Sequence, residues 1–244
     1  MSVTVVNLGT MFVAHLTWPE AGTCAAAGVI LVIPLGATEQ HGPHLPLSTD
    51  TDIAAAVCAR VAAERADVLV APAVPYGASG EHAGFAGTLS IGQAALELLV
   101  VELCRSATDT FDRIVLVNGH GGNVEAVRRA VALLRSESRD VRLFSPGYGG
   151  DPHAGRAETS IQLALTPDLV RADLAEPGDR RPLAELLPLL RAGGVRAVSP
   201  NGILGDPTGS SAGEGAALLN AATTALLADL GRWWPQVPEE GSRR

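Results

Sequence analysis

The fold is indicated first by one short stretch, Val29–Leu35 (VILVIPL). This run is continuously apolar and rich in β-branched residues, which is typical of a strand buried on both faces. Three further strands are predicted at Val68–Pro72, Arg113–Asn118 and Val141–Ser145. We therefore expect a sheet that other elements cover on both sides.

Helical patterns alternate with these strands along the chain. They are predicted at Thr49–Arg65, Ser90–Thr108, Gly122–Ser136, Glu158–Leu165 and Gly213–Trp233. Alternation of strand and helix favours an α/β fold with a mostly parallel sheet and helices on both faces. The carboxyl ends of the strands are then the expected place for a ligand.

The length and segment composition favour one domain over residues 1–244. A single α/β domain of this size is ordinary, and no linker-like segment divides the first 165 residues. The segment Pro177–Pro207 is richer in Gly, Pro and Arg, which predicts an irregular excursion before the closing helix. The polar segment Pro235–Arg244 predicts a flexible tail.

Charge and composition exclude several classes of function. The chain has 26 acidic and 18 basic residues, a formal net charge of −8, which opposes binding to nucleic acid or an acidic membrane. All basic residues are arginine, so lysine-dependent phosphate loops, Schiff bases and serine–lysine hydrolases are excluded. The sequence shows neither a signal-peptide pattern nor an apolar run that could cross a bilayer, so we expect a soluble cytoplasmic protein.

The three cysteines, Cys24, Cys58 and Cys104, are widely separated. They lack the spacing of a zinc finger or of a disulfide framework. Cys58 and Cys104 lie within apolar helical patterns and are predicted to fill the core.

Reactive side chains gather directly after the first predicted strand. Glu39 and His41 alternate in an extended segment, so both side chains can point the same way. Asp50 follows at the mouth of the next helix. Two carboxylates and an imidazole suit Zn, Fe or Mn. A polar turn with a helix-capping aspartate is the alternative interpretation.

A second cluster, Asn118–Asn123 (NGHGGN), follows the strand at Arg113. Its glycines permit close backbone approach and positive φ angles, and His120 could be a metal ligand. A phosphate-binding loop is disfavoured because G-x-G-x-x-G spacing and lysine are both missing. A glycine-rich turn with a solvent-exposed histidine is the remaining alternative.

Two further segments carry candidate residues. His153 could be a base or a ligand, and Glu158 opens a helix, where the dipole alone would also favour a carboxylate. In Tyr76–His82 (YGASGEH), Ser79 does not match the G-x-S-x-G nucleophile pattern, so substrate contact or loop support is expected. Four of the six histidines thus fall in polar, glycine-rich segments after strands, which together predict a metal site.

Five motifs in this order resemble the creatininase (creatinine amidohydrolase) family. They are LGATEQHGPHLPLSTDTDIA (35–54), VPYGASGEHAGFAGTLSIG (74–92), VNGHGGN (117–123), DPHAGRAETS (151–160) and NGILGDPTGSSAGEG (201–215). Within the family, GASGEHAGFAGTLSIG, GGDPHAGRAETS and the terminal RWWPQ are most similar to the peptidase branch of mycofactocin biosynthesis. The resemblance runs from about Val29 to Gly215 and covers most of the chain.

The resemblance implies a dinuclear metallohydrolase with a three-layer α/β/α sandwich, assembled as a homo-oligomer such as a hexamer. It also implies two divalent ions, Zn, Fe or Mn, with Asp50 bridging them. The implied metal ligands are Glu39, His41, Asp50 and His120. Creatinine-hydrolysing members have an acidic ligand at the position of Gly122, so Glu158 is the candidate fifth ligand here.

The resemblance further implies that His153 is the catalytic histidine, with Glu158 beside it at the catalytic centre. Substrate contacts are expected from Ser79, Glu81, His82, Gly121 and Gly122. The implied reaction is cleavage of the modified mycofactocin precursor peptide, which releases its C-terminal Val–Tyr-derived core. An aromatic residue that packs on creatinine is replaced here by Gly149, which disfavours creatinine. Hydrolysis of another small cyclic amide or a formamide, and a non-catalytic binding module, remain alternatives.

Overall fold

The sheet at the centre of the molecule has four parallel strands. The computed structural model describes residues 11–235, in which the strands are β1 (Ile30–Leu35), β2 (Val68–Val70), β3 (Arg113–Asn118) and β4 (Asp140–Phe144). Their order is β2-β1-β3-β4, and every pair is parallel. The predicted parallel sheet is confirmed, with β1 and β3 in its interior.

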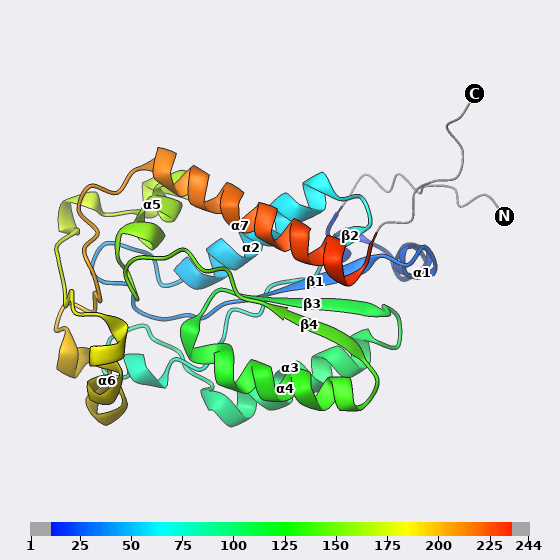
Figure 1. Cartoon of the computed structure of the whole chain (residues 1–244), viewed down its shortest axis with the longest axis horizontal. Coiled ribbons are helices and arrows are strands. Elements are labelled where there is room, and N and C mark those ends of the chain that lie inside the picture. The colour runs from blue at the N-terminus through cyan, green and yellow to red at the C-terminus, as the bar shows by residue number, and fades with distance from the viewer. Residues whose placement is uncertain (1–10, 236–244) are drawn as a thin grey trace.

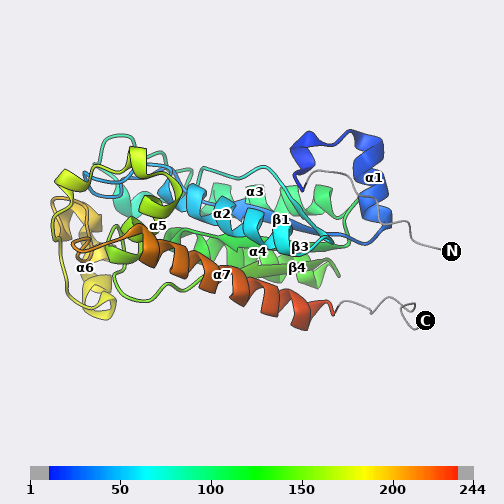
Figure 2. The ribbon, with the colours of Figure 1, turned by 90° about the horizontal axis from the view of Figure 1, so that it is seen from above.

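Helices cover both faces of this sheet. The longer helices are α1 (Trp18–Ala26), α2 (Thr49–Glu64), α3 (Gly92–Ala107), α4 (Val124–Ser136), α5 (Arg156–Leu165), α6 (Leu183–Val198) and α7 (Ala212–Trp233). In Figure 1, α2, α5 and α7 lie above the sheet, and α3 and α4 lie below it. The view from above shows α7 running along the length of the sheet (Figure 2). The three-layer α/β/α arrangement is therefore confirmed.

The alternation of side chains along β1 explains why two layers of helices are needed. Ile30 and Val32 pack in one apolar cluster with α2 and α7, whereas Leu31 and Ile33 pack in another with α3 and α4. All residues of β1 are buried. Burying each such side chain contributes about 1.5–3 kcal/mol, so a strand that is apolar on both faces stabilises both layers. Cys58 and Cys104 are buried in these helical layers, as predicted.

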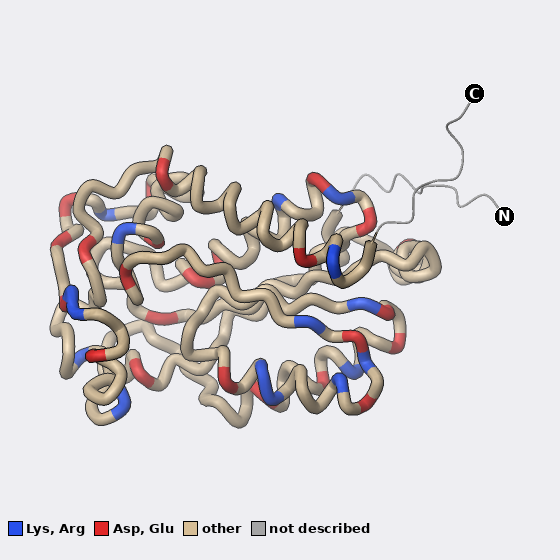
Figure 3. The backbone as a smooth tube through the Cα atoms, viewed as in Figure 1, with Lys and Arg blue, Asp and Glu red and all other residues tan. Residues whose placement is uncertain are grey.

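Ion pairs on the lower layer link the two helices outside the core. Arg129 of α4 contacts Glu97 of α3, and Arg105 of α3 contacts Glu137 just beyond α4. Figure 3 shows basic and acidic residues interspersed on these helices. Exposed pairs of this kind contribute about 0–1 kcal/mol each, so the apolar clusters account for most of the packing.

The prediction for Pro177–Pro207 is wrong, because this segment contains helix α6. Pro188 and the kink at Gly194, where φ is 69°, obscure the helical pattern in the sequence. The kink has a packing role, since a Cβ on Gly194 would lie 2.7 Å from the carbonyl oxygen of Glu81. Helix α6 lies at the end of the molecule opposite α1 (Figure 1).

Smaller differences concern where helices begin. Helix α3 begins at Gly92 with Ile91 as its N-cap, two residues after the predicted start at Ser90. The Ser90 hydroxyl instead accepts hydrogen bonds from the backbone N–H groups of Ser79 and Gly92. A short 3₁₀ turn, Gly121–Asn123, precedes α4. Helix α1 was not predicted, although Thr17 and Glu20 form a capping box at its start. Apart from Pro235, the predicted flexible tail lies outside the residues that the structure describes.

The register of the two central strands determines where the candidate site forms. Leu35, the last residue of β1, pairs with Asn118, the last residue of β3. The segments that carry Glu39 and His120 therefore leave the sheet side by side. Within residues 11–235, the structure has no helix long and apolar enough to span a bilayer.

Candidate metal centre

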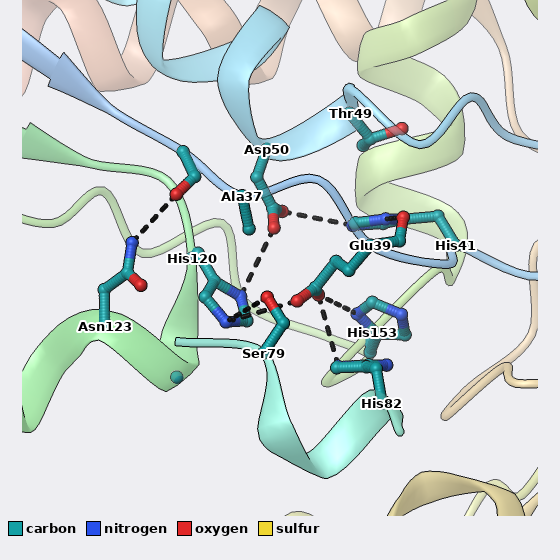
Figure 4. Close-up of polar contacts among 12 residues, drawn as sticks. Ala37, Glu39, His41, Thr49, Asp50, Ser79, His82, His120, Asn123 and His153 are labelled. Carbon is teal, nitrogen blue, oxygen red and sulfur yellow. Dashed lines mark hydrogen bonds and ion pairs between the residues drawn. The ribbon is translucent and has the colours of Figure 1, made fainter. Parts of the chain in front are cut away.

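Side chains from four separate segments converge beyond the carboxyl ends of β1 and β3. Glu39 and His41 lie in the loop after β1, and Asp50 is the second residue of α2. His120 follows β3, and Glu158 lies in the first turn of α5. Figure 4 shows the first four of these side chains pointing toward a common centre. The alternative interpretation of the second cluster, a glycine-rich turn with a solvent-exposed histidine, is wrong because His120 is buried.

Asp50 lies between two imidazoles and contacts each through a different oxygen. Its Oδ1 is 3.1 Å from His41 Nε2, and its Oδ2 is 3.2 Å from His120 Nδ1. The start of α2 holds this carboxylate in place, where the helix dipole also favours negative charge. A carboxylate with its two oxygens directed to different partners has the arrangement that a bridging ligand needs.

Glu39 is fully buried and faces three histidines. Its Oε2 lies 3.2 Å from His120 Nε2, and its Oε1 lies 3.2 Å from His82 Nε2. The Nδ1 of His153 is 3.8 Å from the same Oε1. Glu39 thus connects the His120 side of the centre to the segment that carries His153 (Figure 4).

Glu158 approaches the centre from the His41 side. Its Oε2 lies 3.9 Å from His41 Nε2 and accepts a hydrogen bond of 2.6 Å from the backbone N–H of Ala154. Burial raises the pKa of Glu158, and the charge of His41 opposes that shift. The structure therefore brings together all five residues that the sequence suggested as ligands.

The protonation of the centre reflects two buried carboxylates in close contact. Burial and the charge of Asp50 raise the pKa of Glu39 to about 8. Burial lowers the pKa of His41 and His120, but the neighbouring carboxylates outweigh it and raise these pKa values to about 10 and about 9. The pKa of Asp50 is low despite its burial, because His41 and His120 stabilise its charge. The carboxylates therefore require compensating positive charge, which a bound cation would also supply.

Buried oxygen atoms without hydrogen bonds show that this donor set fits metal ions. Both carboxylate oxygens of Glu39 and Oδ2 of Asp50 are buried and accept no well-directed hydrogen bond, although imidazole nitrogens face them at 3.2 Å. Leaving such atoms unpaired is costly, and cation coordination removes that cost.

Three groups of described residues place one ligand atom each within 4.8 Å of one another: Glu39–His41–His153, Glu39–Asp50–His120 and His41–Asp50–Glu158. The last two groups share Asp50. The centre therefore has enough oxygen and nitrogen donors for two cations with Asp50 between them.

His153 and His82 complete the buried cluster. Their rings are in contact, with centroids 4.4 Å apart and planes tilted by 44°. Burial, with a contribution from the charge of His41, lowers the pKa of His153 well below its usual value and that of His82 to about 3. Both rings are therefore neutral near pH 7, and the unprotonated nitrogen of each is available to a cation. His44, in contrast, lies outside this cluster and hydrogen-bonds with Thr159 Oγ1 at 2.8 Å.

Gly122 leaves room for a carboxylate from another loop. A Cβ on residue 122 would overlap with Glu81 Oε1, Ala78 O and His120 Nε2. Glu81 Oε1 lies 3.6 Å from His120 Nε2, and the Glu81 side chain is 34% exposed. Residue 122 therefore cannot carry the acidic ligand of creatinine-hydrolysing members, and Glu81 occupies the space in which that side chain would begin.

Substitution of Gly122 is expected to disturb the centre. Gly122→Ala should displace Glu81 or His120 and lower the free energy of unfolding by about 1–3 kcal/mol, as in other overpacked sites. Thermal or denaturant unfolding checks this, with zinc affinity as a second measurement. The matched control is Gly121→Ala, because a Cβ there meets nothing within 4 Å. Equal stability of the two variants would contradict this account.

Two supporting residues were not assigned a role from the sequence. Asn123 donates to Gly36 O at 3.0 Å and to Asn118 Oδ1 at 3.1 Å, and its Oδ1 accepts from Ala78 N at 2.9 Å. It therefore ties together the loops after β1 and β3 and the Tyr76–His82 segment (Figure 4). Gln40 is the other, since it contacts both His82 and His153. Both residues lie within the recognised motifs, but neither type of side chain indicates its partner in advance.

Fold and site define an α/β protein whose buried centre is suited to divalent cations. A family model described as Creatininase (creatinine amidohydrolase) matches residues 14–230. Mycofactocin precursor peptide peptidase of Mycobacterium ulcerans is 49% identical over 240 residues, which cover 94% of this chain and 92% of the relative. The protein of the same name from Mycobacterium tuberculosis is 54% identical over 217 residues, covering 84% and 86%.

Solved structures agree with this similarity. A crystal structure of creatinine amidohydrolase (creatininase) has a TM-score of 0.78 and 31% identity, and the match covers 93% of this chain and 99% of that one. The chain therefore belongs to the creatininase family. The resemblance of its motifs to this family is confirmed.

Proposed function

We propose that this protein is a dinuclear metal-dependent hydrolase that cleaves an amide or peptide bond. The observation that carries the proposal is the convergence of five potential ligands around buried carboxylate oxygens that accept no hydrogen bond. The residues that would hold the cations are Glu39, His41, Asp50, His120 and Glu158, with Asp50 shared. Divalent cations at such a site lower the pKa of water toward about 7 and polarise a carbonyl group.

His153 is proposed as the group that moves the proton. Its Nε2 lies 2.8 Å from the carbonyl oxygen of Gln40, which can only accept a hydrogen bond, so Nε2 carries the proton of the neutral ring. Its Nδ1 is then free and faces the centre near Glu39. In the proposed reaction, Nδ1 accepts a proton from the attacking water and delivers it to the nitrogen of the leaving amine.

Substrate contacts are proposed along one side of the centre. Glu81 and Gly121 are accessible at its rim, whereas Ser79 and His82 are buried beside it. Ser79 Oγ lies 3.5 Å from His120 Nε2. Gly122 contributes backbone to the same side. Because Glu81 is an accessible carboxylate, it is suited to accept a hydrogen bond from the substrate on the amine side of the scissile bond.

The proposed substrate is the modified mycofactocin precursor peptide, and the product is its C-terminal Val–Tyr-derived core. Support comes from the two relatives at 49% and 54% identity, both of which are named mycofactocin precursor peptide peptidases. We also propose that the protein acts in the cytoplasm as a homo-oligomer.

The decisive experiment is a mass-spectrometric assay of the modified precursor peptide with protein loaded anaerobically with zinc, iron or manganese. The expected result is release of the C-terminal core and of the shortened leader, with one water incorporated. Intact peptide after incubation with each metal-loaded form would contradict the proposed substrate.

A second candidate is hydrolysis of a small cyclic amide or formamide. The similarity to solved creatininase structures favours it. The glycines at positions 122 and 149 disfavour creatinine itself, because neither an acidic ligand nor an aromatic platform is present there. Turnover of creatinine or a formamide without peptide cleavage would establish this alternative. A non-catalytic binding module would instead bind peptide without cleaving it in any metal-loaded form.

Metal binding is expected to release protons. His41 and His120 have raised pKa values of about 10 and about 9, so both are protonated at pH 7 before a cation binds. A cation binds the unprotonated imidazole, so affinity should rise with pH between 6 and 8, by about tenfold per pH unit for each proton released. Calorimetric titration with zinc in buffers of different ionisation enthalpy measures this release. An affinity that does not change over this range would contradict the assigned protonation.

A further inference from the structure

One motif of the sequence, residues 201–215, has no part in the proposed reaction, yet it lies against the turn that carries His153. His153 and Leu204 are paired in both directions. The N–H of His153 donates to Leu204 O at 3.2 Å, and the N–H of Leu204 donates to His153 O at 2.9 Å. The 201–215 motif therefore supports the backbone of His153.

The Asp151 side chain joins the same two segments. Its Oδ2 accepts hydrogen bonds from the backbone N–H of Arg156 at 3.0 Å and from that of Asp206 at 3.1 Å. Arg156 is the first residue of α5. Because the first N–H groups of a helix have no partner within it, and the helix dipole favours negative charge there, this is a stabilising place for a carboxylate. Asp151 thus bridges the start of α5 and the 201–215 motif.

Two glycines, one from each segment, make room for this carboxylate. A Cβ on Gly155 would lie 2.2 Å from Asp151 Cβ, and a Cβ on Gly205 would lie 2.2 Å from the same atom. Gly205 also has φ of +145°, a conformation that residues other than glycine rarely adopt. Both segments are therefore shaped around the Asp151 side chain.

The turn that Asp151 holds is strained directly after His153. Ala154 has φ of 52°, one of two positive φ values among the non-glycine residues of the range 11–235. Such a conformation is unfavourable for a residue with a Cβ and persists where surrounding contacts impose it. The N–H of Ala154 donates to Glu158 Oε2 at 2.6 Å. Contacts on both sides of Ala154 therefore determine the direction in which the His153 side chain leaves the backbone.

We propose that Asp151 is a positioning residue for His153. By linking the start of α5 to the 201–215 motif, its carboxylate holds the strained turn in place, so that His153 Nδ1 stays 3.8 Å from Glu39 Oε1 at the centre. The inference rests on the proposed role of His153 in proton transfer and adds the residue that keeps this group in place. Without the carboxylate, the turn is expected to relax and turnover to slow, while the ligands remain.

The test compares Asp151→Ala with Asp151→Asn in the full chain loaded with zinc. Alanine removes the acceptor, whereas the amide oxygen of asparagine can accept both backbone hydrogen bonds. Without substrate, NMR should show the Leu204 N–H exchanging with solvent about 10–100-fold faster in Asp151→Ala than in the unchanged protein. The ring ¹H–¹³C signals of His153 should broaden in the same variant. Asp151→Asn should keep slow exchange and sharp signals.

The second measurement is turnover of the modified precursor peptide. Asp151→Ala should lower kcat about 10–100-fold, because a misplaced catalytic group has an effect of this size. KM and zinc content should stay unchanged, and Asp151→Asn should restore most of kcat. If Asp151→Ala does not fold, Gly155→Ala provides an independent variant, because its Cβ would displace the Asp151 side chain.

The control is Asp206→Ala, which removes another carboxylate of the same motif. The Asp206 side chain contacts Thr208 and Arg180. The variant keeps the backbone N–H that donates to Asp151. Exchange of the Leu204 N–H and kcat should therefore match those of the unchanged protein.

Slow exchange of the Leu204 N–H in folded Asp151→Ala would overturn the proposed bridge, and an unchanged kcat would overturn its effect on His153. Loss of zinc from this variant would show that Asp151 acts through Glu158 instead, which would also contradict the inference. If the unchanged protein does not cleave the peptide, the proposed substrate fails. The exchange rate and the His153 signals, measured without substrate, still decide whether Asp151 positions His153.

Discussion

Asp50→Ala is expected to remove bound metal and hydrolytic activity together. Asp50 contacts His41 and His120 through different oxygens, so its loss removes the group shared by both proposed cation sites. The cations are expected to supply several kcal/mol of transition-state stabilisation, so activity should fall by at least about 10³-fold. Metal quantification of the purified variant and the peptide assay measure the two effects. Asp50→Asn should behave similarly, because it keeps the volume but removes the charge.

Asp52→Asn is the matched control, since it changes a carboxylate on the same helix turn that lies outside the centre. Asp52 instead accepts hydrogen bonds from Ser48 and Gln162. This variant should retain metal and activity. An Asp50→Ala protein that is both active and fully loaded would refute the ligand assignment.

His153→Ala is expected to separate metal binding from turnover. The variant should retain most of its metal, because Glu39, His41, Asp50, His120 and Glu158 remain in place. Turnover should fall by about 10²–10⁴-fold, which is the usual contribution of a positioned proton-transfer group. Single-turnover measurements on metal-loaded protein test the chemical step directly.

The structure also allows His153 to be a ligand, through its group with Glu39 and His41. Loss of about half of the metal in His153→Ala would support that role over proton transfer. His44→Ala serves as the control, because it removes a buried imidazole that contacts Thr159 and lies outside the cluster. Normal turnover of metal-loaded His153→Ala would exclude a catalytic role.

The central strands could be predicted from local signals, whereas the five candidate ligands were suggested by polar clusters after the strands together with the resemblance to a family. β1 is apolar at every position, and Asp50 lies at the start of a helix with a regular pattern. Helix α6 could not be predicted in the same way, since Pro188 and Gly194 interrupt its periodicity. Its position depends on contact with the Glu81 backbone, which is distant in sequence.

The roles of Gln40, Glu81 and Asn123 likewise depend on distant partners. Gln40 contacts Gly202, which lies 162 positions further along the chain. A glutamine or an asparagine has no local pattern that identifies such a partner. Glu81 could be seen as a candidate for substrate contact, but its place beside Gly122 follows only from the packing of two loops.

The order of residue types along this chain was sufficient to indicate a parallel α/β sheet, its family, and a set of carboxylate and imidazole ligands. Those features follow from short-range periodicity and from motifs in which spacing is preserved. Tertiary structure alone decided which oxygen faces which histidine and which side chains support the ligands. The physical reason is that hydrogen bonds and ion pairs act over about 3–4 Å, and only folding brings residues so far apart in sequence within that distance.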